Sequence, residues 1–419
     1  MNIFNVTSKY FFASFFPKII SIIILPVILR LITAENWGKI SLILIFQQVI
    51  GTVIHHGIST RLMNNNLNQK ISKNEVYLSY CELLITTLFT LLLVYITNLN
   101  TLFSVTFNPL FWATTAVFFQ NITSIQKTIF KINEKNNDYF FITFFETLSL
   151  LSFQFIFLLR EINLVGYQSS GIPSSYFIGG CISGLVIVML FQFRIELILN
   201  WNTNFVFKNI FNKKISTTVT LDSSMLFLIA WSDRFFIKEL SNLQLVGIYS
   251  VYDSLSRLLR VSLEGLLNLI TTNFYLRKNT ENYLNSLITD LKSISKYFAI
   301  LGVITLSFIG EFILPENYTK FTTLIIPLAV TYHLQNLISI EKNYLIKSKK
   351  FKKLLVAVFI GLIVNLVLNF FLIKEYSIYG AALATFFSTL IMFLLICGVK
   401  KSKFSVVDFI YLVSFSFSC

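Results

Sequence analysis

The sequence predicts an all-α integral membrane protein with about twelve transmembrane helices, arranged as two six-helix lobes. Of its 419 residues, 55% are hydrophobic and only 13% are charged, which is about half the charged share of an ordinary soluble domain. Apolar runs of about 20 residues, long enough to cross a bilayer as helices, recur twelve times along the chain. This composition leaves too few polar side chains to cover a water-facing surface, and it excludes a soluble enzyme or a disordered chain.

The twelve apolar runs fall into two groups of six. The first six spans are expected at residues 10–32, 38–57, 76–96, 103–124, 139–159 and 174–193. The second six are expected at residues 217–237, 246–272, 291–309, 321–340, 354–373 and 378–399. These spans predict an N-terminal lobe over residues 1–207, a C-terminal lobe over 208–397, and a cytoplasmic or interfacial tail over 398–419.

Lysine and arginine lie in short clusters between the apolar runs, and the richer clusters alternate with poorer ones. Loops on one predicted side hold 22 of these cations and the opposite loops hold 6. Because short cytoplasmic loops are enriched in Lys and Arg, both termini are predicted to be cytoplasmic. The same clustering accounts for the formal charge of +14 without nucleic acid as a partner.

The two halves of the chain share a short pattern. A Leu, a Gly and a Ser within residues 31–41 recur 209 residues later as Leu240, Gly247 and Ser250. Halves with an even number of spans have the same orientation in the membrane. We therefore expect the lobes to be related by a pseudo-two-fold axis along the membrane normal, with a cavity near the midplane.

Three stretches, in this order along the chain, carry a resemblance to a known family. The first is Pro17-Lys18 with the following segment to Arg61, the second is Ser232–Ile237 followed by Val246–Ser250, and the third is Asn365–Asn369 with Tyr379–Thr385. Together they resemble the O-antigen and related polysaccharide flippases (Wzx-like) of the multidrug/oligosaccharidyl-lipid/polysaccharide exporter superfamily.

The resemblance implies a transporter and no enzymatic activity. Its substrate would be an undecaprenyl-diphosphate-linked O-antigen or capsular repeat unit, moved by alternating access from the cytoplasmic to the periplasmic leaflet of a bacterial inner membrane. The implied partners are this lipid-linked oligosaccharide, membrane lipids, an O-antigen polymerase and a chain-length regulator. No cofactor is implied.

A few polar residues inside the apolar runs are the candidates for substrate binding. A cation at the bilayer centre costs about 2.5 to 3.5 kcal/mol, so it is expected to face a cavity or a partner. Arg234 follows Asp233 directly, which allows either a structural ion pair or a role in binding. The substrate-binding candidates are Lys18, Arg257, Arg260, Arg234 and Gln48.

The predicted eighth span carries a polar stripe, defined here as Asp253, Arg257, Arg260, Glu264 and Asn268. At 100° per residue these positions fall within about 80° of one another. The spacing permits ion pairs between residues four apart, so the stripe is either self-neutralised packing or a substrate site. The 209-residue offset places Gln48, Thr52 and His55 on the equivalent face of the second span.

In the related flippases, basic residues on the first, second and eighth helices are thought to hold the diphosphate. Lys18 and the Arg257/Arg260 pair match two of these places, whereas the second span has Arg61 only at its cytoplasmic end. Buried carboxylates can carry a coupling proton, because burial favours their neutral form. The coupling candidates are Glu82, Glu146, Asp253 and Glu264, with Asp222 on the predicted seventh span as a further acidic residue that could carry a proton. The histidines show no metal-binding spacing.

Two other functions remain open at this stage. A cation-coupled multidrug exporter of the same superfamily fits the helix count, although it would need an acidic cavity for organic cations. A membrane polymerase or acyltransferase of polysaccharide synthesis fits the composition. Such an enzyme would need a sizeable periplasmic loop or a His/Asp active site, and the sequence shows neither.

Overall fold

A computed structural model of the chain describes residues 19–21, 23–65, 73–97, 107–133, 135–166, 171–192, 214–260, 297, 300–347 and 350–397. All regular structure in these segments is helical, and none of them contains a strand. The described residues divide into two compact units, with the division between Phe227 and Leu228. The predicted boundary between residues 207 and 208 lies outside the described residues and stays a prediction.

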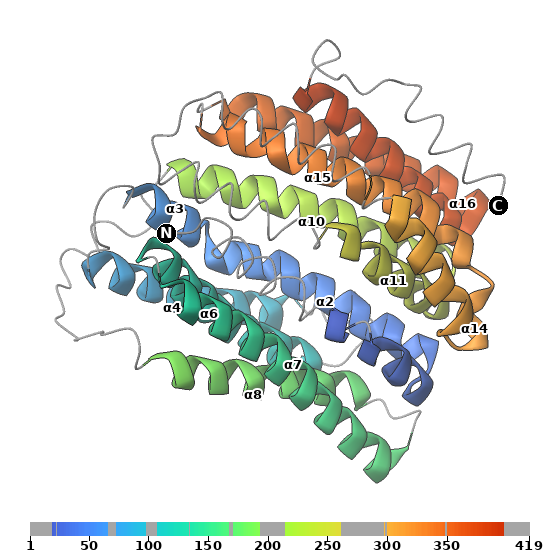
Figure 1. Cartoon of the computed structure of the whole chain (residues 1–419), viewed down its shortest axis with the longest axis horizontal. Helices are drawn as coiled ribbons and strands as arrows, with labels where there is room; N and C mark the ends of the chain where they lie inside the picture. The colour runs from blue at the N-terminus through green and yellow to red at the C-terminus, as the bar shows by residue number, and fades with distance from the viewer. Residues whose placement is uncertain are drawn as a thin grey trace. The chain divides into compact units, whose positions relative to one another are not determined.

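The N-terminal unit is a set of long helices (Figure 1). It contains an apolar helix Ile19–Leu31, α2 (Ala34–His55), α3 (Ile58–Asn65), α4 (Lys73–Ile96), α6 (Phe107–Ile132), α7 (Asn136–Val165), α8 (Ile172–Gln192) and the first part of α10 (Lys214–Leu240). Helices α6 and α7 pack against α8, and α2 and α4 pack against α6. Each of the first six predicted spans overlaps one of these helices, and residues 10–18 and 103–106 of the predicted spans lie outside the described residues.

The C-terminal unit contains the rest of α10 and the helices that follow it. These are α11 (Leu243–Ser256), an apolar helix Ile300–Phe312, α14 (Glu316–Thr319), the 3₁₀ turn η1 (Thr322–Leu324), α15 (Ile325–Lys347) and α16 (Phe351–Cys397). The long α16 is broken at Ser377, where φ is 51° and ψ is −129°. This break falls between the predicted spans 354–373 and 378–399, so α16 holds both of them.

Length and composition agree with a membrane protein. Among the described residues, six helices are long and apolar enough to cross a membrane, and α16 counts as one of them. Helix α4 exposes Leu88, Phe89 and Leu92, each more than half exposed, as expected for side chains in contact with lipid. The predicted fold class, an all-helical membrane protein with two lobes, is confirmed.

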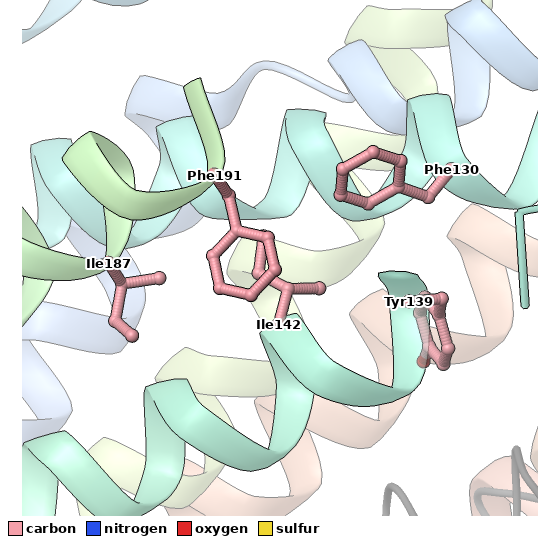
Figure 2. Close-up of a cluster of buried hydrophobic side chains, with 5 residues drawn as sticks. All are labelled: Phe130, Tyr139, Ile142, Ile187 and Phe191. Atoms are coloured by element: carbon pink, nitrogen blue, oxygen red, sulfur yellow. The ribbon is translucent and has the colours of Figure 1, made fainter. Parts of the chain in front are cut away.

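Aromatic and small side chains together pack α6, α7 and α8. Phe130, Tyr139, Ile142, Ile187 and Phe191 form a buried cluster where these three helices meet (Figure 2). Small residues allow membrane helices to approach closely, because no side chain separates their backbones. Gly179 of α8 makes such a contact with α7, because the atoms nearest to where a Cβ would lie belong to the backbone of Phe153 and Gln154.

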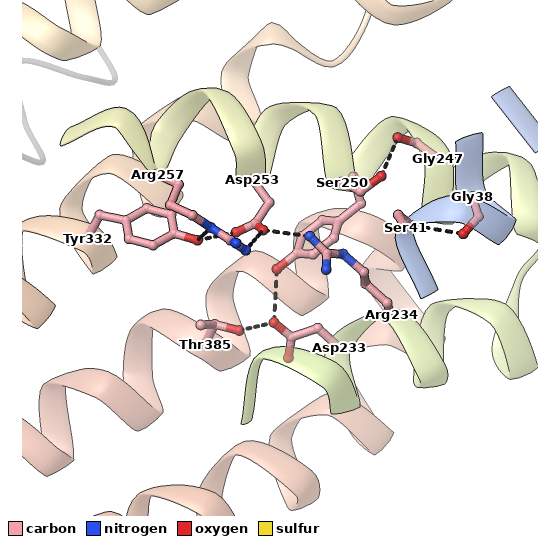
Figure 3. Close-up of polar contacts among 11 residues, drawn as sticks. Gly38, Ser41, Asp233, Arg234, Gly247, Ser250, Asp253, Arg257, Tyr332 and Thr385 are labelled. Atoms are coloured by element: carbon pink, nitrogen blue, oxygen red, sulfur yellow. Dashed lines mark hydrogen bonds and ion pairs between the residues drawn. The ribbon is translucent and has the colours of Figure 1, made fainter. Parts of the chain in front are cut away.

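The shared pattern of the two halves has the same local structure in each. Helices α2 and α11 begin 209 residues apart, and the side chains of Thr33 and Asn242 cap their first turns. In both, the Ser hydroxyl donates to the Gly carbonyl three residues earlier, at Gly38 and at Gly247, with a distance of 2.8 Å (Figure 3). The symmetry axis between the lobes stays a prediction.

Replacing Gly179 by Ala tests the close packing of α8 on α7. The added methyl group would lie 2.6 Å from the Phe153 carbonyl oxygen, and backbone atoms cannot move aside easily. We expect Gly179→Ala to destabilise the protein by about 1 to 3 kcal/mol, measured as a lower thermal unfolding midpoint in detergent. Gly180→Ala is the control, because its methyl group would meet only side chains at ordinary contact distances, the nearest being Gln154 at 3.5 Å. Equal midpoints for the two variants would contradict this packing.

Candidate functional site

The Asp253 carboxylate organises a buried ionic cluster in the C-terminal unit. Its Oδ2 accepts hydrogen bonds from Arg234 of α10 at 2.6 Å and from Arg257 at 2.8 Å (Figure 3). The Tyr332 hydroxyl of α15 donates to Oδ1, and Arg257 Nε donates to the Tyr332 oxygen at 3.3 Å. The ion pair that the spacing of Asp253 and Arg257 permits is therefore present, whereas no sequence pattern pointed to Tyr332.

This cluster carries excess positive charge. Two guanidinium groups share one carboxylate, so the three ionic groups have a formal sum of +1. The Arg234 side chain is 5% exposed, whereas that of Arg257 is 31% exposed. Arg234 thus neutralises Asp253 from within the helix packing, and Arg257 is the accessible cation of the pair.

Beyond Arg257 only one further residue of the predicted stripe, Arg260, is described. Helix α11 ends at Ser256, inside the predicted span 246–272, and the Arg260 N–H donates to the Arg257 carbonyl three residues earlier at 3.0 Å. The exposed Arg260 side chain donates to the Gln335 Oε1 of α15 at 3.1 Å. The other stripe positions, Glu264 and Asn268, lie outside the described residues, as does the candidate Lys18.

Asp233 forms a second buried network, made with neutral donors. Its carboxylate accepts hydrogen bonds from Thr385 (Figure 3) and from the Tyr249 hydroxyl at 2.9 Å. It also accepts hydrogen bonds from Asn369 at 2.7 Å and from Asn365 at 3.3 Å. Asp233 is 2% exposed. The network joins α10, α11 and α16, and it brings together residues of two of the sequence stretches that carry the family resemblance.

In the N-terminal unit, two coupling candidates are paired with cations of neighbouring helices. Glu82 of α4 forms an ion pair of 2.5 Å with Arg61 of α3, and both side chains are buried. Arg61 also donates to the Ser79 hydroxyl at 3.2 Å. Glu146 of α7 pairs with Lys127 of α6. The sequence placed Glu82 and Glu146 within predicted spans but did not predict their ion-pair partners.

A cavity of about 640 Å³ lies in the N-terminal unit, lined mainly by α2, α3 and α6. Gln48, Thr52 and His55, which the sequence places on one face, all line it. The offset of 209 residues relates this lining to the polar stripe. The counterparts of all five stripe positions are lining residues, namely Leu44, Gln48, Gly51, His55 and Ser59.

The described parts of the chain hold no group of three or more His, Cys, Asp or Glu side chains that could bind a metal ion. The polar groups of this region are instead Arg, amide and hydroxyl side chains. Such side chains bind a ligand through charge-assisted and neutral hydrogen bonds.

The helical architecture is shared with solved structures of membrane transporters. The chain is similar in fold to the lipid II flippase MurJ in an inward closed conformation, with a TM-score of 0.58 and 14% identity over 99% of this chain and 89% of that one. It is also similar to a mutant of the Vibrio cholerae MATE transporter VcmN, with a TM-score of 0.64 and 10% identity over 100% and 97%. A MOP superfamily transporter from Pyrococcus furiosus gives 0.61 and 12% over 99% and 96%. The chain thus has the MOP transporter fold.

The family follows from the sequence itself. Residues 7–275, which are more than half of the chain, match the model of the polysaccharide biosynthesis protein family, and the chain belongs to that family. No curated protein sequence matches the chain significantly.

Replacing Asp253 by Asn tests the ionic cluster. The change leaves Arg234 and Arg257 without a counter-ion, and an uncompensated buried charge costs about 3 to 5 kcal/mol. We expect Asp253→Asn to lower membrane abundance and the thermal unfolding midpoint. Glu239→Gln is the control, because Glu239 is half exposed and its ion pair with Lys238 contributes little. Unchanged abundance of the Asp253 variant would show that another group balances the two arginines.

Replacing Tyr249 by Phe tests the Asp233 network. A hydrogen bond to a charged group contributes about 1.5 to 3 kcal/mol, so Tyr249→Phe is expected to lower the thermal unfolding midpoint. Tyr80→Phe is the matched control, since the buried Tyr80 hydroxyl has no hydrogen-bond partner among the described residues. We expect this control to be neutral or stabilising, and a larger loss in the control than in Tyr249→Phe would refute the assignment.

Proposed function

We propose that the protein is a flippase for undecaprenyl-diphosphate-linked O-antigen or capsular repeat units. It moves them by alternating access from the cytoplasmic to the periplasmic leaflet of a bacterial inner membrane, with both of its own termini in the cytoplasm. Membership of the polysaccharide biosynthesis protein family and the fold shared with a lipid II flippase support this proposal. It performs transport and no chemical step.

The observation that carries the proposal is the excess positive charge at the accessible Arg257. A diphosphate inside a membrane protein needs cationic donors, and guanidinium groups bind phosphate oxygens with strong, charge-assisted hydrogen bonds. Arg257 and Arg260 occupy stripe positions whose counterparts in the N-terminal unit line a cavity. This correspondence supports an equivalent role for the stripe in facing the cargo.

The remaining polar candidates complete the proposal. Lys18 and Gln48 contribute to substrate binding, while Arg234 acts mainly by holding Asp253. Coupling to an ion gradient involves the carboxylates Glu82, Glu146, Asp253 and Glu264, of which the first three are paired with cations. An O-antigen polymerase and a chain-length regulator are the proposed protein partners.

A multidrug exporter is the second candidate, because MATE transporters share the fold. Transporters of organic cations need an exposed carboxylate in the substrate site, since opposite charge stabilises the bound ligand. In the cluster described here the Asp253 carboxylate is shared by two arginines, so it is not available to a bound cation. The flippase is therefore the preferred function.

Replacing the two stripe arginines tests the flippase proposal. Purified Arg257→Gln and Arg260→Gln are each expected to bind an undecaprenyl-diphosphate-linked sugar about 10- to 100-fold more weakly, because charge-assisted hydrogen bonds are lost. Arg257→Gln leaves Arg234 and Asp253 as a balanced pair, so membrane abundance should stay normal. Binding is measured in nanodiscs, and export of repeat units is measured in cells that lack their own flippase.

The matched control is Arg160→Gln, which removes an exposed arginine of α7 from outside the cluster. Full binding and export in both stripe variants would overturn the proposed site. Wild-type protein that binds an organic cation and no diphosphate lipid would favour the multidrug exporter instead.

A further inference from the structure

The cavity of the N-terminal unit has hydrogen-bonding capacity but no formal charge in its lining. Among the described residues that line it there is no Asp, Glu, Lys or Arg. Amide and hydroxyl side chains dominate, including Gln47, Gln48, Gln120, Asn121 and Ser124. Its volume of about 640 Å³ lies within the range of small-molecule sites, which is about 300 to 1,000 Å³.

The charged groups next to lining residues in the sequence are not themselves part of the lining. Asp222, which precedes the lining residue Ser223, is buried, and Arg61 follows the lining residue Thr60. Arg61 and Glu82 neutralise each other in a buried ion pair and are not part of the lining. The C-terminal counterparts of two lining residues, Leu44 and Gln48, are the charged Asp253 and Arg257. At these equivalent positions the side chains are therefore charged in the C-terminal half and uncharged in the N-terminal half.

The backbone beside the cavity is broken, which is a second sign of a built site. His56 and Gly57 have φ values of 44° and 62°, and they interrupt the helix between α2 and α3. Side chains of other helices satisfy two carbonyls of the last turns of α2. Asn121 donates to Gly51 at 3.2 Å, and Thr86 donates to Ile54 at 3.0 Å. Irregular backbone at membrane depth is tolerated where protein buries it or where it lines a polar cavity.

Several lining side chains have hydrogen-bonding groups available for a ligand. Gln47 and Gln120 approach each other only to 3.5 Å, which is a long and weak hydrogen bond. Among the hydrogen bonds of the described residues, none involves the Gln48 amide. Neutral amides and hydroxyls match the hydroxyl and N-acetyl groups of a sugar, whereas a diphosphate requires cations and an organic cation requires a carboxylate.

We infer that this cavity binds the uncharged sugar portion of the cargo, while the stripe of the C-terminal unit binds its diphosphate. The inference rests on the proposed flippase function and assigns the carbohydrate to side chains of α2 and α6. Gln48 is the residue that best tests it, because it lines the cavity and its amide makes no hydrogen bond among the described residues.

The experiment compares two lipids on the purified full-length protein in nanodiscs. One probe is undecaprenyl diphosphate carrying a single N-acetylhexosamine, and the other is undecaprenyl diphosphate alone. Gln48→Leu should weaken binding of the sugar-bearing probe about 2- to 12-fold, which corresponds to one neutral hydrogen bond, and leave the sugar-free probe unchanged. Ser124→Ala should act in the same direction, and Gln244→Leu, at an exposed position of α11, is the matched control.

A measurement on the wild-type protein accompanies the variants, so that misfolding of a variant cannot decide the result. A diazirine attached to the N-acetyl group of the sugar-bearing probe should label peptides of α2 or α6. Labelling confined to peptides of α11 and α15 would overturn the inference.

The outcomes separate the two proposals. If wild-type protein binds neither lipid, the flippase function fails and the sugar site fails with it. If Gln48→Leu weakens both lipids equally, the cavity binds the diphosphate, and the sugar site is wrong while the flippase function stands. Unchanged binding of the sugar-bearing probe in both cavity variants also refutes the sugar site alone.

Discussion

Polar groups inside a hydrocarbon layer must find their partners within the protein, and this constraint governs the C-terminal unit. An unpaired polar group costs several kcal/mol there, because no water replaces the lost hydrogen bond. Asp253 is satisfied by two guanidinium groups and a Tyr hydroxyl, and Asp233 is satisfied by neutral donors. Since these donors come from α10, α11, α15 and α16, satisfying two carboxylates also fixes how four helices pack.

The same constraint explains why the equivalent helices α2 and α11 carry different polar side chains. Helices α2 and α11 begin with the same cap and the same Ser-to-Gly hydrogen bond. Their faces then differ, since Gln48 stands where the other half has Arg257. A buried charge needs a partner and a neutral amide does not, so the charged face holds Arg257 next to Asp253, which Arg234 and Tyr332 also contact. The proposed division of the cargo into diphosphate and sugar follows this difference.

Sequence reasoning succeeded where the interaction was local. It located the long apolar helices that the structure describes, although α3 and α14 lie in predicted loops. It also allowed the pairing of Asp253 with Arg257, because residues four apart lie on one face of a helix. It did not predict the partner of Arg234. Arg234 follows Asp233 yet bonds to Asp253, because successive side chains on a helix point about 100° apart. The eighth predicted span is interrupted by one turn residue at Arg257 and is helical again to Arg260, and its remaining residues 261–272 lie outside the described residues.

By itself, the sequence determined the fold class, the approximate ends of the described helices and the 209-residue offset of the repeat. These depend on apolar run length and short motifs, which are local properties of the chain. Only the tertiary structure decided which polar groups meet and where a cavity remains. Asp233 and Thr385 are 152 residues apart and come together on different helices. The physical reason is that helix packing sets such contacts, and packing depends on the shapes of all the neighbouring side chains at once.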